Sequence, residues 1–170
     1  MGFVLLLGGA RSGKSALAVR LAHDSNLPVT VIATATAGDE EMVDRIRRHR
    51  EARPSAWKTV EEPIDVLGAL RSSAAGDFVI VDCLTLWVTN LLGAGHDAAD
   101  FDRLADPIVR ELGGRRGVVV TNEVGMGIVP ANELARQFRD VLGFVNTRFA
   151  EGAERAVLMV AGRAVELKRT

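Results

Sequence analysis

The chain has 170 residues, a length that suits one domain, residues 1–170, with a substantial hydrophobic core. With 48% hydrophobic residues, 25% charged residues and a net charge of −1, it offers no field that attracts nucleic acid and no apolar stretch suited to membrane insertion. The single cysteine, Cys83, excludes an internal disulfide framework and predicts a reducing, cytoplasmic environment.

The first predicted element is a buried strand, the apolar run 3–7, which leads into a glycine-rich segment. Apolar residues from Ala16 onward predict a helix directly after that segment. A strand, a glycine-rich loop and a helix in this order are the context of a P-loop, which binds a nucleoside triphosphate. The loop matches the pattern G-x-x-x-x-G-K-[ST] at Gly8, Gly9, Ala10, Arg11, Ser12, Gly13, Lys14 and Ser15.

The residue types of this loop explain the expected chemistry. Backbone N–H groups of such a loop and the positive end of the helix dipole surround a polyphosphate. Lys14 is expected to reach the outer phosphates, and the Ser15 hydroxyl is expected to bind Mg²⁺. The alternative, a glycine-rich turn that merely opens a helix, explains neither the lysine nor the serine.

A second buried strand is predicted at 29–35, where β-branched residues gather. The stretch 39–53 predicts a helix with acidic residues early and arginines late, and Pro54 ends it. Residues 57–60 suit a short third strand, and Pro63 is expected to open the next helix, which runs through Leu70.

The charged helix has two interpretations. Spacing of four places Arg45, His49 and Arg53 on one face. In the first interpretation this face is solvated and stabilised by the pairs Glu41–Arg45 and Asp44–Arg48. In the second, His49 is a nucleophile toward phosphorus, and the arginines bind a polyphosphate. Spacing does not decide between the two.

The apolar run 78–82 predicts a strand that ends in Asp82, which is the Walker B pattern. In that pattern the carboxylate at the end of the strand faces the Mg²⁺ of the nucleotide. An alternative role for Asp82 is to cap the helix that follows it.

The remaining elements alternate in the same way. We expect a polar loop at 93–100, helices at 101–112 and 131–151, strands at 117–122 and 156–161, a loop at 123–130 and a short edge strand at 165–168. The alternation predicts an α/β fold of the P-loop NTPase type, a single domain with a mainly parallel sheet and helices on both faces. Ligands bind such sheets at the carboxyl ends of the strands.

Several segments together resemble one family, adenosylcobinamide kinase / adenosylcobinamide-phosphate guanylyltransferase. They cover most of the chain in the family's order and lie at 8–15, 45–54, 81–92, 120–130 and 136–146. The resemblance implies an enzyme that phosphorylates the aminopropanol hydroxyl of adenosylcobinamide with ATP or GTP. It then implies transfer of GMP from GTP to an enzyme histidine and on to the cobinamide phosphate, giving adenosylcobinamide-GDP and pyrophosphate.

The resemblance also assigns roles to individual residues. His49 matches the guanylylated histidine; Lys14 and Asp82 match further catalytic positions, although some relatives carry Glu in place of Asp82. Ser15 and Asp82 are the implied Mg²⁺ ligands. Glu61 matches an acid that binds the nucleotide, with an exposed loop acid as the alternative. The further nucleotide-binding positions, beyond the P-loop, are Thr34, Ala35, Thr36, Arg50, Glu51, Ala52, Arg53 and Asp82. A homotrimer is implied as well.

Two rival functions remain at this point: a P-loop kinase of another small molecule, without guanylyltransferase activity, and a non-catalytic nucleotide-dependent binding module. Neither needs His49, so covalent labelling by GMP distinguishes them from the bifunctional enzyme. Guanylylation also requires attack on the α-phosphate, whereas a P-loop presents the γ-phosphate. We therefore expect one nucleotide site and a mobile helix that carries His49.

Overall fold

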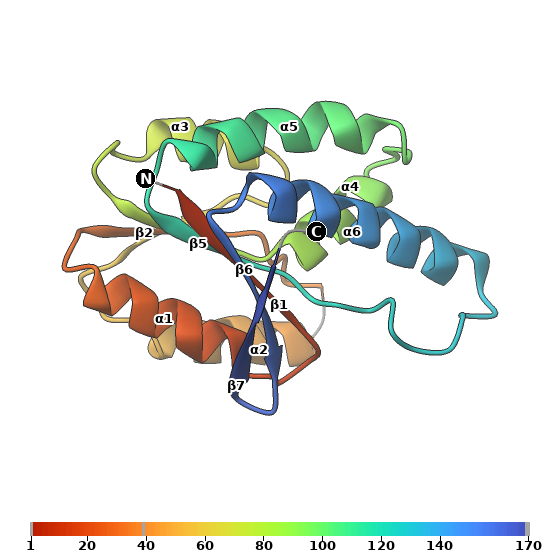
Figure 1. Cartoon of the computed structure of the whole chain (residues 1–170), viewed down its shortest axis with the longest axis horizontal. Helices are drawn as coiled ribbons and strands as arrows, with labels where there is room; N and C mark the ends of the chain where they lie inside the picture. Colours follow the sequence, from red (N-terminus) through yellow and green to blue (C-terminus); the bar gives the residue numbers. More distant parts are fainter. Residues whose placement is uncertain (1, 39, 169–170) are drawn as a thin grey trace.

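A seven-stranded sheet runs through the middle of the molecule in the computed structural model, which describes residues 2–38 and 40–168 except for the side chains of Glu41 and Arg45 (Figure 1). The strand order is β3-β2-β4-β5-β1-β6-β7. All neighbouring strands are parallel except β6 and β7, which form an antiparallel edge. The strands are β1 Phe3–Gly8, β2 Val29–Ala33, β3 Lys58–Glu61, β4 Phe78–Asp82, β5 Gly117–Val120, β6 Arg155–Val160 and β7 Arg163–Leu167.

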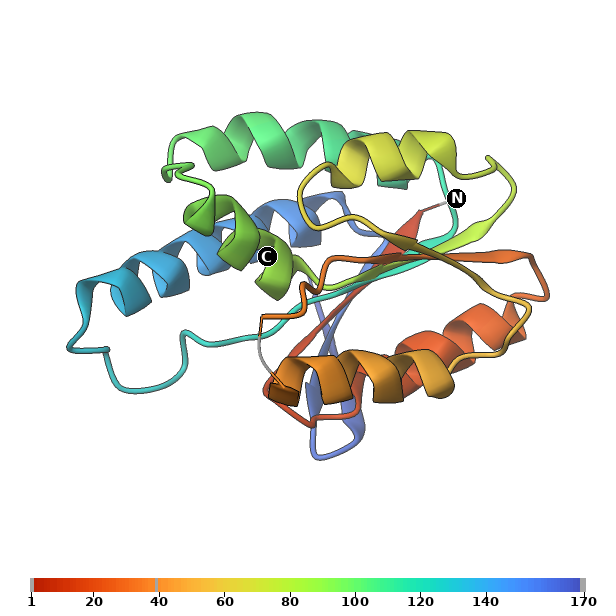
Figure 2. The ribbon, with the colours of Figure 1, turned by 180° about the vertical axis from the view of Figure 1, so that it is seen from behind.

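Helices cover both faces of this sheet. Figures 1 and 2 show α1 and α2 on one side and α3, α4, α5 and α6 on the other. The helices are α1 Lys14–Asp24, α2 Glu40–Glu51, α3 Val66–Ser72, α4 Leu84–Gly93, α5 Asp100–Gly113 and α6 Glu133–Gly152. The predicted architecture, a mainly parallel sheet between two helical layers, is therefore confirmed.

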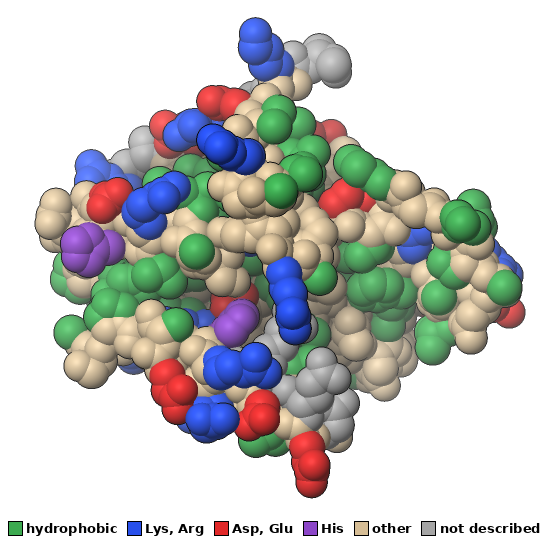
Figure 3. Space-filling view, turned by 90° about the horizontal axis from the view of Figure 1, so that it is seen from below, with side chains coloured by type: hydrophobic (Ala, Val, Ile, Leu, Met, Phe, Trp, Pro, Cys, Tyr) green, Lys and Arg blue, Asp and Glu red, His purple; other side chains and the backbone are tan. Residues whose placement is uncertain are grey.

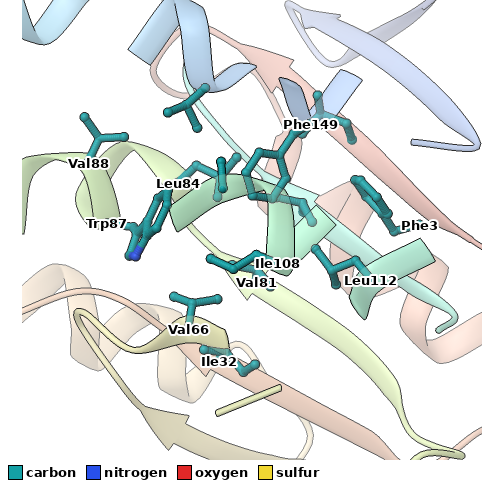
Figure 4. Packing of buried hydrophobic residues seen from close by; sticks show 14 of the residues in the cluster. Phe3, Ile32, Val66, Val81, Leu84, Trp87, Val88, Ile108, Leu112 and Phe149 are labelled. Carbon is teal, nitrogen blue, oxygen red and sulfur yellow. The ribbon is translucent and has the colours of Figure 1, made fainter. Parts of the chain in front are cut away.

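Burial on both faces explains why the first strand is an unbroken apolar run. Phe3 and Leu5 pack into the cluster shared with α3, α4, α5 and α6, whereas Leu6 packs into the cluster under α1. All three side chains are fully buried, as expected for a parallel strand with helices above and below. Figure 4 shows the larger cluster. Within it, the ring of Phe149 packs edge to face on Phe3, and that of Trp87 packs edge to face on Phe101.

Some element boundaries differ from the prediction, and tertiary hydrogen bonds explain the differences. β2 ends at Ala33 rather than residue 35, because the Thr34 hydroxyl donates to the Cys83 carbonyl at 2.7 Å and accepts from the Cys83 N–H at 2.9 Å. β5 ends at Val120 rather than residue 122. The predicted start of α2, Asp39, lies outside the described residues, as do the side chains of the predicted Glu41–Arg45 pair.

Helix caps correct two further expectations. Asp82 does not cap α4, because Cys83 occupies the N-cap position, so the capping role for Asp82 was wrong. The third helix begins at Val66 and not at Pro63, because the Asp65 side chain accepts from the Gly68 N–H. α4 itself forms a helix of ten residues with Trp87 buried. Among the described helices, none combines the length and apolar character needed to cross a bilayer.

Candidate functional site

The glycine-rich segment forms the tight turn that a P-loop needs between β1 and α1. Gly8 has φ +148° and Gly13 has φ +99°, backbone conformations that residues with a Cβ rarely adopt. A Cβ at Gly8 would also collide with the backbone carbonyl of Met159 in β6. Gly13 is the N-cap of α1, and its carbonyl accepts from the Leu17 N–H at 3.0 Å. The loop therefore presents the N-terminal end of α1 to the carboxyl edge of the sheet.

Lys14 lies folded across this loop. Its ammonium donates to the carbonyls of Gly8 at 2.8 Å and Gly9 at 2.6 Å, and to the Ser12 hydroxyl at 3.4 Å. Only 7% of Lys14 is exposed, so these acceptors satisfy a largely buried charge. A triphosphate in the loop offers the same ammonium a stronger, anionic partner.

A cleft of about 650 Å³ opens beside the loop. Its walls come from the P-loop and α1, from α2, and from the ends of β4 and β5. The lining residues are Ala10, Arg11, Ser12, Gly13, Lys14, Ser15, Ala16, Arg48, His49, Asp82, Cys83, Val120 and Asn122. Four independent predictions meet here, because Lys14, Ser15, His49 and Asp82 share one cavity.

Asp82 connects the end of β4 to the end of α2. Its Oδ2 lies 2.8 Å from the Arg53 guanidinium and 3.5 Å from His49 Nδ1. Burial by itself raises the pKa of Asp82, but the contacts with His49 and Arg53 outweigh that effect and leave the pKa below its ordinary value. The carboxylate is therefore ionised at neutral pH.

A second, more apolar pocket shares His49, Asp82 and Cys83 with the cleft. Arg50 and Glu61 stand at this pocket and form an ion pair at 2.8 Å, with both side chains more than half exposed. Sequence reasoning placed Arg50, Glu61 and Ala35 near a nucleotide but missed the rest of the apolar wall. That wall includes Ala33, Ala35, Met42, Ile46 and Leu86. The spacing of Met42, Ile46 and His49 along α2 was the available signal.

His49 and Asp82 line both of these pockets and a third that lies against α1 and includes Ser15 and Ala52. The three cavities are thus neighbours around one imidazole. Figure 3 shows the face that carries α1, α2 and the β6–β7 hairpin, where Lys and Arg side chains gather around a histidine set into the surface. Cationic groups beside an open cavity suit an anionic ligand.

Not every predicted nucleotide-binding residue lies at these cavities. Thr34 is fully buried and uses its hydroxyl to join the ends of β2 and β4 through Cys83, so its side chain has a structural role in this state. Thr36 is exposed and lines none of the three cavities. Glu51 is also outside them and pairs with Arg47 at 3.3 Å.

Cys83 lines the cleft but is poorly suited to be a nucleophile. Burial, together with the negative charge of Asp82, raises the pKa of the Cys83 thiol to about 11. The thiol is therefore protonated at neutral pH, which suits a small packing residue rather than a nucleophile.

The exit of β5 is fixed by a side-chain network that sequence reasoning did not foresee. Asn146 of α6 is 5% exposed; its Oδ1 accepts from the Thr121 hydroxyl at 2.7 Å, and its Nδ2 donates to the Asn122 carbonyl at 3.0 Å. The Asn122 N–H donates to the Thr85 hydroxyl at 2.8 Å. Glu123 accepts from the Gly125 N–H, which ties it to its own loop. These bonds set the position of Asn122 at the cleft.

The donor set at the cleft fits Mg²⁺. The Ser15 hydroxyl and the Asp82 carboxylate both line it and both present oxygen, the ligand atom that Mg²⁺ prefers. Within residues 2–38 and 40–168, no group of three or more His, Cys, Asp or Glu side chains is arranged to hold a metal.

Comparisons with known proteins agree with this geometry. The model of the family described as cobinamide kinase / cobinamide phosphate guanyltransferase matches residues 4–167. The bifunctional adenosylcobalamin biosynthesis protein CobP of Pseudomonas aeruginosa is 48% identical over 167 residues, which cover 96% of each chain. The bifunctional adenosylcobalamin biosynthesis protein CobU of Salmonella typhimurium is 41% identical over 97% of this chain and 99% of its own.

Solved structures share the fold at low sequence identity. A Pyrococcus horikoshii OT3 protein superposes with a TM-score of 0.60 at 9% identity, covering 97% of this chain and 85% of its own. The RadB recombinase superposes with a TM-score of 0.52 at 14% identity over 92% of this chain and 73% of its own. At such identities the likeness concerns the fold alone.

Proposed function

The chain belongs to the cobinamide kinase / cobinamide phosphate guanyltransferase family, and we propose that one cleft, with His49 at its centre, serves both reactions. The protein is a bifunctional enzyme of cobalamin biosynthesis. It phosphorylates the aminopropanol hydroxyl of adenosylcobinamide with ATP or GTP, and it transfers GMP from GTP to the product to give adenosylcobinamide-GDP. The observation that carries the proposal is that His49 lines the same cleft as Lys14 and Ser15.

In the kinase reaction the P-loop holds the triphosphate by its backbone amides at the start of α1. We assign Lys14 to the outer phosphates, where its ammonium exchanges the carbonyls of Gly8 and Gly9 for phosphate oxygens. Ser15 and Asp82 would hold Mg²⁺, which offsets phosphate charge when it is bound. Arg53 and Arg48 bring further positive charge to the cavities, where it opposes the charge that develops on the phosphates.

In the guanylyltransferase reaction we assign the nucleophile to His49. An imidazole nitrogen attacks the α-phosphorus, an N–P bond forms, and the bond to pyrophosphate breaks. A phosphate oxygen of the cobinamide phosphate then attacks the same phosphorus and releases the imidazole. Splitting the transfer in this way replaces one difficult displacement by two easier ones.

We assign the guanine base to the apolar pocket beside α2. Its apolar lining at Ala33, Ala35 and Leu86 suits an aromatic ring, and the Glu61 carboxylate suits the N–H groups on the edge of guanine. Arg50 pairs with Glu61 while the pocket is empty. The same pocket borders His49, so a base bound there keeps its α-phosphate on the histidine side of the cleft.

The test of this proposal is incubation of the protein with Mg²⁺ and GTP that carries radioactive phosphorus in the α-position, followed by denaturing electrophoresis. An acid-labile, alkali-stable label is expected on the wild-type chain and on His23→Ala, since His23 is an exposed histidine that lines none of the three cavities. No label is expected on His49→Ala. A folded wild-type enzyme without label would leave only the kinase reaction, and label on His49→Ala would remove His49 as the nucleophile.

A second variant tests whether one nucleotide site serves both reactions. Lys14→Ala is expected to lower the rate of phosphorylation and the rate of GMP labelling together, each by roughly 100-fold or more. The shared cleft supports this expectation, because Lys14 and His49 both line it. Loss of kinase activity with unchanged labelling would instead require two sites.

A further inference from the structure

His49 meets Asp82 through one particular ring nitrogen. Nδ1 lies 3.5 Å from Asp82 Oδ2, and the same oxygen accepts from Arg53 at 2.8 Å. The Asp82 side chain is 15% exposed, and that of Arg53 is 10% exposed, so the carboxylate is held in a shielded place. His49 is more open, with 37% of its side chain exposed, as a group that must reach a substrate needs to be.

We propose that Asp82 is a positioning residue that keeps the proton of neutral His49 on Nδ1, so that Nε2 is the nitrogen that bonds to GMP. This inference rests on the proposed role of His49 as the nucleophile. An ionised carboxylate only accepts hydrogen bonds, so the nitrogen that faces it must carry the proton. The opposite ring nitrogen then has the free electron pair that a nucleophile needs.

Arg53 gives this arrangement its rigidity. The Arg53 guanidinium, just after the end of α2, donates to Asp82 Oδ2, so the carboxylate cannot turn away without losing a charge-assisted hydrogen bond in a shielded place. A carboxylate has two oxygens and about four acceptor positions, so Asp82 retains capacity for a water ligand of Mg²⁺ while Oδ2 faces His49. One side chain can therefore serve the metal and the nucleophile.

With the proton on Nδ1, both steps of the transfer balance without any further proton transfer at the ring. When Nε2 attacks the α-phosphorus, its electron pair forms the N–P bond, and the electron pair of the breaking P–O bond leaves with pyrophosphate. The ring then carries phosphorus on Nε2 and hydrogen on Nδ1, a cation that faces the Asp82 carboxylate. When the phosphate of the acceptor attacks phosphorus, the N–P electron pair returns to Nε2 and the ring is neutral again. The proton never leaves Nδ1.

The decisive measurement is the position of phosphorus on the ring in the guanylylated wild-type enzyme. The trapped intermediate is digested under alkaline conditions, and the isomer of the phosphohistidine linkage is assigned by phosphorus and proton NMR against both synthetic isomers. Linkage through Nε2 is expected. Linkage through Nδ1 on His49 would overturn the inference and leave the proposed nucleophile intact, whereas absence of any label on His49 would reject the proposed function itself.

A second measurement needs no nucleotide and no metal. Nitrogen–proton correlation NMR on apo enzyme labelled at its three histidines, at a pH where the rings are neutral, reports which nitrogen carries each proton. The Nδ1–H form is expected for His49 in the wild type and in Asp82→Glu, and a mixture or the Nε2–H form in Asp82→Asn. His96, whose Nδ1 lies 3.3 Å from Asp100 Oδ2, should keep its signal in every variant and so serves as an internal reference.

Ser15→Ala is the matched control for the loss of metal binding. It removes an oxygen from the Mg²⁺ site but does not touch His49, so it should keep the wild-type tautomer and the Nε2 linkage. Asp82→Asn is expected to guanylylate at least roughly 100-fold more slowly than Ser15→Ala, because the amide favours the wrong tautomer. An unchanged His49 tautomer in Asp82→Asn, or equal labelling rates in the two variants, would refute a positioning role for Asp82.

Discussion

Asp82, at the end of β4, combines three roles in one side chain. It belongs to the predicted Mg²⁺ site, it faces His49, and it holds Arg53 at the end of α2. The sequence pattern of an apolar strand that ends in an acid predicted the first of these roles. The other two depend on a helix that precedes β4 by 26 residues and becomes its neighbour only in the folded chain.

Because the pKa of Asp82 is depressed in the folded state, its contacts stabilise the protein above the ordinary Asp pKa of about 4, and this contribution is lost as the pH falls through the lower, folded-state pKa. Asp82→Asn should therefore lower the free energy of unfolding at pH 7 by about 2 kcal/mol, and the difference from wild type should shrink in strong acid. Urea denaturation across pH measures this.

The control for this experiment is Glu166→Gln. Glu166 is also held below its ordinary pKa, chiefly by a hydrogen bond from Arg155, but the pair is exposed to water on the β6–β7 edge. Exposed ion pairs contribute little to stability, so this variant should unfold like the wild type at neutral pH. Equal losses in Asp82→Asn and Glu166→Gln would mean that burial of the Arg53–Asp82 pair is energetically unimportant.

At the scale of elements, α6 does more than cover the sheet. Its Asn146 is placed by the apolar stripe of the helix, since Leu142, Val145 and Phe149 are fully buried around it. The buried amide then satisfies the backbone carbonyl of Asn122 and the hydroxyl of Thr121, where β5 becomes a loop. The hydrogen bonds of Asn146 therefore fix the end of β5 to α6.

Asn146→Ala should leave the buried Thr121 hydroxyl and the partly buried Asn122 carbonyl without this partner and lower the free energy of unfolding by about 2 kcal/mol. The Asn122 end of the cleft should loosen as well, so the KM values for both reactions are expected to rise more than the kcat values fall. Denaturant unfolding and steady-state kinetics measure the two effects. The adjacent Thr147 is exposed, and its hydroxyl donates to the Gly143 carbonyl within α6, so Thr147→Ala is a control that should change neither.

At the scale of the whole molecule, exposed apolar side chains gather on two segments of the surface, the 123–130 loop and β7. The 123–130 loop extends from the body of the protein (Figure 1), and Met126, Ile128 and Val129 on it are 78%, 97% and 62% exposed. On the sheet edge, every residue of β7 is exposed, including Val165 and Leu167. Large apolar side chains exposed on a monomer often mark a surface that meets a partner.

The homotrimer implied by the family resemblance remains a prediction, and these surfaces support it. Light scattering coupled to size-exclusion chromatography should give about three times the chain mass of 18.2 kDa. Ile128→Ser with Val165→Ser is expected to reduce the mass if either segment lies between subunits. A monomeric wild type would contradict the prediction. The exposed loop would then be a candidate binding surface for the corrinoid substrate instead.

The sequence by itself determined the local features. The P-loop follows from a spacing of glycine, lysine and serine that needs only its own backbone, and the strands follow from apolar runs that any buried parallel sheet demands. The order of the elements, the Walker B acid and the family could also be predicted from the sequence, because short runs of neighbouring residues identify each of them.

Only the tertiary structure decided which residues share a cavity and which hydrogen-bond partners their polar atoms have. Thr34 was predicted to touch nucleotide, yet its hydroxyl joins two strand ends. His49 and Arg53 were known to share a helix face, but their common partner, Asp82, is set by how α2 lies against the end of β4. Hydrogen bonds between distant segments depend on orientation and distance in space, and a linear pattern of residue types records neither.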